Sequence, residues 1–169
     1  MKRLILGLAM MALIVAGASA IDFGANFTIF PEEDAQLYGL TIRSVGEAFI
    51  GFDLTAMTPA LSDAGNPLEN LLDLINNRDN INTVWFLPTL LLNASMKPVH
   101  FYAGAGPFIY FAKNQEGKWD FSLVDSVFGK VGAQLNVAFV GAYAEAGVLY
   151  NWNFGTFVPL YTFGAVLNF

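Results

Sequence analysis

Apolar and polar residues alternate along most of the chain after residue 20. Side chains of a β-strand point alternately to its two faces, so this pattern predicts strands with one apolar face and one small or polar face. Turn-forming or charged residues separate the alternating segments. Eight segments can be traced in this way: residues 21–29, 37–44, 48–56, 83–96, 99–113, 118–138, 141–152 and 161–169.

The contrast between the two faces distinguishes a membrane barrel from a soluble one. The apolar face carries almost no charge, whereas the other face is rich in Gly, Ser, Thr and Asn with isolated charges. A lipocalin-like barrel or a β-sandwich would need a polar, charged exterior. The chain is 55% apolar with a mean hydropathy of +0.49, yet after residue 20 no apolar run reaches the roughly 18 residues of a helical span. The pattern predicts an all-β fold, an eight-stranded antiparallel up-and-down transmembrane β-barrel.

The last segment and one central segment point to a family. Aromatic or apolar residues occupy alternate positions up to the terminal phenylalanine: Tyr161, Phe163, Ala165, Leu167 and Phe169. This ending resembles the carboxy-terminal signal of bacterial outer-membrane barrels, and the aromatic, glycine-alternating segment 101–108 resembles a strand of the small OmpA/OmpX/OmpW-like class. The resemblance implies a location in the bacterial outer membrane, contact with its lipid, and insertion by the barrel-assembly machinery. It also implies that the last strand closes the barrel against the first.

Residues 1–20 are predicted to be a signal peptide. Lys2 and Arg3 precede a short apolar run, and Ala18-Ser19-Ala20 provides small residues before a cleavage site. Residues 21–169 would then form one barrel domain. Cleavage lowers the number of Lys and Arg residues from 8 to 6 against 14 acidic residues, which changes the net charge from −6 to −8. An acidic exported chain has no basic stripe for nucleic acid.

An even number of strands places both termini on the periplasmic side and the connections after strands one, three, five and seven outside. In the second external loop, Asn66-Pro67 is a typical helix start. The apolar residues that follow have helical spacing: Leu68, Leu71, Leu72 and Ile75. We expect a short amphipathic helix over Asn66–Asn77 that packs on the rim, or else acts as a lid or a lipid contact.

Charged residues at inward positions predict a polar network in the lumen. Its expected members are Asp22, Arg43, Glu47, Asp53, Lys130 and Glu145. Acids together with bases indicate a structural network rather than a pair of catalytic carboxylates. A turn over Glu32–Ala35 would place Arg43 opposite Gly24. Bulky inward side chains that alternate with glycines predict a filled lumen.

Candidate catalytic residues are few. Cysteine is absent, and the single histidine, His100, falls at the periplasmic end of its strand. The lipid A acylating and deacylating barrels are similar in size but place histidine toward the outer leaflet. We therefore expect no catalytic set, no metal site and no cofactor, and a structural or surface-interaction role. The alternatives are a narrow channel or a hydrophobic-solute conduit and, less favoured, a lipid-modifying enzyme.

Overall fold

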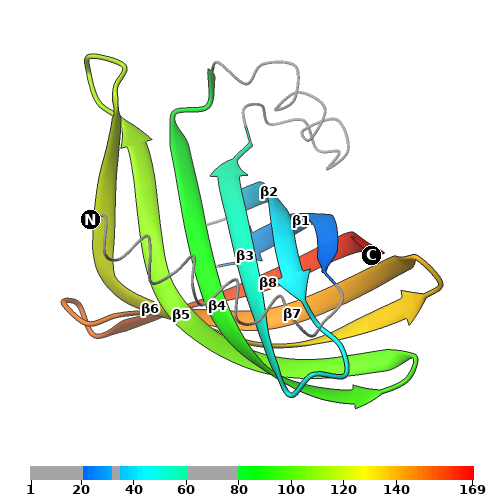
Figure 1. The fold of residues 1–169 in the computed structure, drawn as a ribbon. Helices are drawn as coiled ribbons and strands as arrows, with labels where there is room; N and C mark the ends of the chain where they lie inside the picture. The colour runs from blue at the N-terminus through cyan, green and yellow to red at the C-terminus, as the bar shows by residue number, and fades with distance from the viewer. Residues whose placement is uncertain (1–20, 32–34, 61–79) are drawn as a thin grey trace.

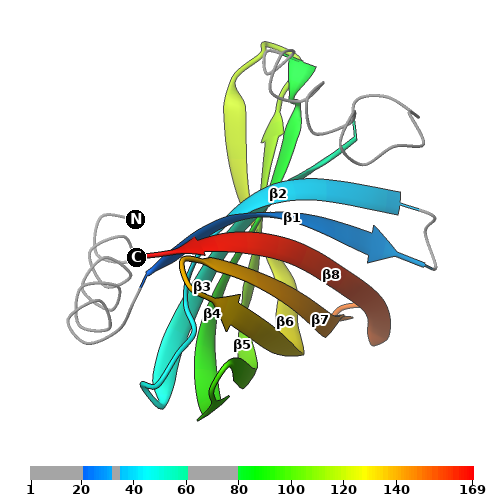
Figure 2. The ribbon, with the colours of Figure 1, turned by 90° about the vertical axis from the view of Figure 1, so that its right-hand side faces the viewer.

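The computed structural model describes residues 21–31, 35–60 and 80–169, and eight antiparallel strands close into a barrel (Figures 1 and 2). The strands are β1 (Asp22–Phe30), β2 (Ala35–Ser44), β3 (Ile50–Pro59), β4 (Thr83–Met96), β5 (Val99–Lys113), β6 (Trp119–Val137), β7 (Val140–Asn151) and β8 (Thr156–Asn168). The predicted fold class is confirmed. The signal peptide at 1–20 and the helix at 66–77 lie outside the described residues. Within those residues, no helix is long and apolar enough to span a membrane.

The first and last strands close the barrel. Ala25 is opposite Ala165, and Phe27 is opposite Phe163. The backbone N–H of Phe169 donates to the carbonyl of Ile21 at 3.2 Å. The carboxy-terminal strand therefore lies against the first strand, and no edge is left open where the sheet closes; Figure 2 shows β1 and β8 side by side.

Side chains alternate between the lumen and the outer surface, as the period-two pattern predicts. On β2, Leu40 is 66% exposed, whereas Thr41 and Arg43 are buried. On β8, Phe163 points outward and Thr162 inward. The outer surface is thus apolar and the lumen is lined by the other face of each strand.

The two ends of the barrel differ in their connections. We call the end with connections 31–34, 60–82, 114–118 and 152–155 the long-loop end. The short-turn end has connections 45–49, 97–98 and 138–139, together with the start of β1 and the end of β8. Connection 45–49 is as long as 114–118, so the predicted asymmetry rests mainly on 60–82.

The register of the first hairpin differs from the prediction. Arg43 is opposite Asp22, not Gly24, which is opposite Thr41. The reason is that Phe30 pairs with Ala35. The connection between the two strands therefore begins at residue 31, one residue earlier than the predicted turn at 32–35. The resulting shift of two residues leaves every side chain on its predicted face.

Two prolines mark irregular pairing around β5. The ladder between β4 and β5 is interrupted between Phe86↔Ile109 and Leu90↔Ala105, the stretch that contains Pro88. Between β5 and β6 the register shifts between Pro107 and Ile109. Proline cannot donate to a ladder, so it is tolerated where the ladder is broken. Pro88 therefore lies where the ladder is irregular.

Candidate functional site

Four charged side chains from four strands meet inside the barrel and form what we call the charged ring. Arg43 Nη2 lies 2.9 Å from Asp53 Oδ2 and 2.6 Å from Glu145 Oε1. Lys130 Nζ lies 2.6 Å from Asp53 Oδ2 and 2.9 Å from Glu145 Oε1. Each cation therefore contacts both carboxylates, and the ring of two cations and two anions is neutral.

Hydroxyl groups complete the coordination of the two carboxylates. Thr41 and Thr55 donate to Asp53 Oδ1 at 2.8 and 2.6 Å. The phenol of Tyr102 donates to Glu145 Oε1 at 2.9 Å. Buried charge is tolerated when it is paired and hydrogen-bonded. Asp53, Glu145 and Lys130 meet both conditions, whereas Arg43 is paired through Nη2 and its buried Nε and Nη1 have no hydrogen-bond partner among the described residues.

Arg43 is held between two aromatic rings. Its guanidinium carbon lies 4.0 Å from the centroid of the Tyr143 ring and 4.7 Å from that of Tyr102. Cation–π attraction of this kind strengthens when water is excluded. Gly132 and Gly164 provide the space for these rings, because a Cβ at Gly132 would lie 2.7 Å from the Tyr102 ring and one at Gly164 would meet the Tyr143 ring. Large rings and glycines thus fill this part of the lumen together.

The other two predicted members of the network lie apart from the ring. Asp22 is buried and accepts a hydrogen bond from Gln134 Nε2 at 2.7 Å, toward the short-turn end. Glu47 is not in the lumen, and its prediction was wrong. It belongs to the connection 45–49 beyond the end of β2, where its side chain is 68% exposed and pairs with Lys97 of the next turn. Strand alternation does not extend into that connection.

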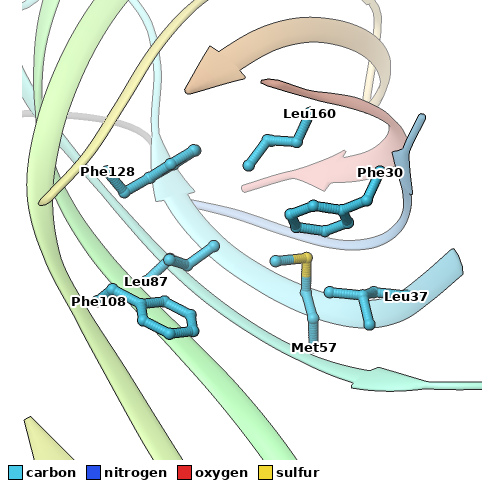
Figure 3. Packing of buried hydrophobic residues seen from close by; sticks show 7 residues of the cluster. All are labelled: Phe30, Leu37, Met57, Leu87, Phe108, Phe128 and Leu160. Atoms are coloured by element: carbon cyan, nitrogen blue, oxygen red, sulfur yellow. The ribbon is translucent and has the colours of Figure 1, made fainter. Parts of the chain in front are cut away.

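A second layer in the lumen is apolar and lies next to the charged ring on its long-loop side. Every strand except β7 contributes one buried side chain, and Figure 3 shows these side chains directed toward one another. The members of this apolar layer are Phe30, Leu37, Met57, Leu87, Phe108, Phe128 and Leu160. Trp85 makes edge contacts with the rings of Phe30 and Phe108, with centroids 5.2 and 5.1 Å apart.

The apolar layer was not predicted from the sequence, although the alternation of side chains contained the information needed to predict it. Of the bulky inward side chains that predicted a filled lumen, Phe108 belongs to this set, and the segment 83–96 was expected to be apolar on both faces. Extending the period-two register of each strand to its long-loop end would have placed Phe30, Leu87 and Phe128 inward as well. The layer closes the lumen above the charged ring, because side chains that pack against one another leave no continuous water column.

The described residues offer little for catalysis. Ser95 Oγ lies 2.8 Å from His100 Nδ1 across the β4–β5 hairpin at the short-turn end. Among the described residues, no group of three or more His, Asp or Glu side chains could hold a metal ion.

No protein-family model and no curated protein matches the chain. Solved structures match it in fold. The N-terminal β-barrel domain of Pseudomonas aeruginosa OprF matches with a TM-score of 0.57 and 14% identity, over 89% of this chain and 98% of that one. A de novo designed transmembrane β-barrel matches with a TM-score of 0.54 and 9% identity, over 89% and 96%. At such identities the likeness concerns the fold alone, which is that of the small eight-stranded outer-membrane barrels.

Proposed function

We propose that this chain is a non-enzymatic integral protein of the bacterial outer membrane, an occluded barrel that anchors its long loops at the cell surface. The observation that carries the proposal is the double closure of the lumen by the charged ring and the apolar layer. A barrel that conducts solutes needs a continuous wet path, and either layer alone interrupts one. A filled barrel instead provides a rigid support for loops.

The outer surface supports the membrane location. Large apolar side chains are exposed there on successive strands, among them Leu90, Val131 and Phe163. In water such a surface would promote association, whereas in lipid it is the required exterior. The pairing of β8 with β1 supports a role for the terminal strand, with its outward Tyr161 and Phe169, as the signal for the barrel-assembly machinery.

Solute efflux from liposomes tests this function. The purified protein, refolded into vesicles that contain a small sugar, is expected to leave the sugar inside at the rate of protein-free vesicles. Efflux as fast as that from a general porin reconstituted at the same density would contradict the proposal. Turnover of an ester lipid substrate by the same preparation would instead indicate an enzyme.

A hydrophobic-solute conduit is the second candidate, because the apolar layer gives the long-loop half of the lumen a surface that an alkyl chain could contact. The charged ring stands against it, since an alkyl chain would have to displace four paired charges to pass. Saturable binding of a fluorescent fatty acid that is lost in Leu87→Asp, but kept in the outward variant Leu90→Asp, would favour the conduit.

A further inference from the structure

The guanidinium of Arg43 has donors that the charged ring does not use. Its Nη2 pairs with Asp53 and Glu145, whereas Nε and Nη1 are buried and have no hydrogen-bond partner among the described residues. The rings of Tyr102 and Tyr143 lie against the guanidinium, with centroids 4.7 and 4.0 Å from its carbon. Because these rings cover its faces, an acceptor can reach Nε and Nη1 only in the guanidinium plane.

Asp22 carries the complementary acceptor. It is directly opposite Arg43 in the ladder of β1 and β2, and both side chains are buried in the lumen, with 1% and 0% exposed. Asp22 Oδ2 accepts from Gln134 Nε2 at 2.7 Å, but Asp22 Oδ1 and Gln134 Oε1 have no partner among the described residues. Asp22 is not among the ion-pair partners of Arg43. The two charged groups are therefore neighbours without direct contact.

Unpaired donors and unpaired acceptors thus meet at one place in the lumen. A buried polar group without a hydrogen bond is costly, and most such groups in proteins pair with another protein group or with ordered water. An occupant of this place must accept from Arg43 and donate to Asp22 Oδ1. Charge narrows the choice further, because the guanidinium repels a cation and the carboxylate repels an anion. A small neutral molecule that both donates and accepts meets these conditions.

We propose that one internal water molecule is bound between Arg43, Asp22 and Gln134. It accepts a hydrogen bond from the unused N–H groups of Arg43 and donates to Asp22 Oδ1 and Gln134 Oε1. Three hydrogen bonds are typical of a buried water molecule, and each of the three protein groups is itself buried in the lumen.

This water site connects the seam of the barrel to the charged ring. Asp22 is opposite Arg43 on β2 and opposite Asn168 on β8, so it lies where the first and last strands meet. The charged ring balances its own charges, which leaves Asp22 as an additional buried acid that hydrogen bonds must stabilise. Gln134 supplies one such bond and the water supplies a second. A single isolated water does not form a continuous column, so the lumen stays closed.

Nuclear magnetic resonance of the full chain in micelles can detect this water through Arg43. The chain contains three arginines, Arg3, Arg43 and Arg78, so labelling with ¹⁵N-arginine gives few Nε–H signals. The variants Arg3→Lys and Arg78→Lys assign the remaining signal to Arg43. We expect a cross peak between the Arg43 Nε–H proton and the water resonance, with the rotating-frame sign of dipolar contact rather than of exchange. The absence of this cross peak in the wild type would overturn the proposal.

Matched variants of the lumen separate the site from general hydration. Asp22→Leu removes the charged acceptor and is expected to lose the cross peak. Thr28→Val on the same strand is the control, because Thr28 is equally buried but is hydrogen-bonded to Met57 and Thr162 instead. It is expected to keep the cross peak. If Asp22→Leu does not fold, Gln134→Met removes one acceptor and is expected to weaken the signal. An equally strong cross peak in every folded variant would contradict the proposed site.

A crystal structure of the full chain distinguishes water from the other possible occupants. We expect the density of one light atom at hydrogen-bonding distance from Arg43, Asp22 and Gln134. Soaking the crystals in rubidium bromide tests for ions, because rubidium substitutes for a bound cation and bromide for a bound anion. An anomalous peak of either ion at this place, or a direct ion pair between Asp22 and Arg43, would overturn the proposal.

Discussion

Arg43 of β2 and Glu145 of β7, separated by 102 residues in sequence, are joined by a hydrogen bond of 2.6 Å across the lumen. Their strands are not neighbours in the sheet, so the contact spans the inside of the barrel. It links opposite parts of the wall through a charge pair from which water is excluded. The lumen is therefore part of the structural core.

Loss of one member of the charged ring is expected to destabilise the barrel more than loss of a balanced pair. Arg43→Met leaves Asp53 and Glu145 with a single cation, and removal of one partner from a buried ion pair costs about 3–5 kcal/mol. The double variant Arg43→Met/Glu145→Gln leaves the neutral pair of Lys130 and Asp53, so it should lose less than the two single variants together. Urea unfolding in lipid vesicles measures the difference. Simple additivity of the two single losses would show that Arg43 and Glu145 are not coupled.

Gly132 is expected to tolerate no side chain. A Cβ there would lie 2.7 Å from the ring of Tyr102, whose hydroxyl is fixed by Glu145. Gly132→Ala should therefore destabilise the barrel by about 1–3 kcal/mol, the usual cost of overpacking. Gly46→Ala is the matched control, because a Cβ at Gly46 meets nothing within 4 Å. Equal unfolding midpoints for both variants would show that the ring moves aside without cost.

The terminal strand is expected to matter for assembly as well as for stability. Deletion of Phe169, or polar replacement of Tyr161 and Phe169 together, should reduce insertion in vivo far more than the inward change Asn168→Ser. Outward polar residues also lose contact with lipid, so refolding into detergent is compared in parallel to measure simple destabilisation. If all variants accumulate equally in the membrane, the terminal pattern is a strand pattern without a role in assembly.

The pKa of Glu47, which lies outside the lumen, is expected to depend on the charge of Lys97. The hydrogen bond and charge of Lys97 hold the pKa of the Glu47 carboxyl below its ordinary value of 4.5. Because the folded pKa is lowered, the pairing stabilises the turn above the ordinary pKa and is lost as the pH falls through the folded pKa. A carboxyl titration followed by NMR should move back toward the ordinary value in Lys97→Gln. An unchanged midpoint would show that the two side chains do not pair in solution.

The fold could be predicted because its main determinant is periodic in sequence. Alternation between Leu40, Thr41 and Ile42, repeated on each strand, specifies both faces of the wall, and an error of two residues in register does not disturb it. The contacts within the charged ring are harder to predict from the sequence, because Asp53 and Lys130 are 77 residues apart and their contact depends on side-chain reach across the lumen. Glu47 lies where alternation ends, and the register shift between Pro107 and Ile109 is a local irregularity that no periodic pattern contains.

Single-channel recording in planar bilayers tests the occluded barrel most directly. The unmodified protein is expected to give no steady porin-like conductance, while a porin reconstituted in the same way gives stable steps. Arg43→Ala and Lys130→Ala, which open the charged ring, are expected to raise leakage or to lower stability. Large, stable conductance steps from the unmodified protein would contradict the account and would make a channel the leading function.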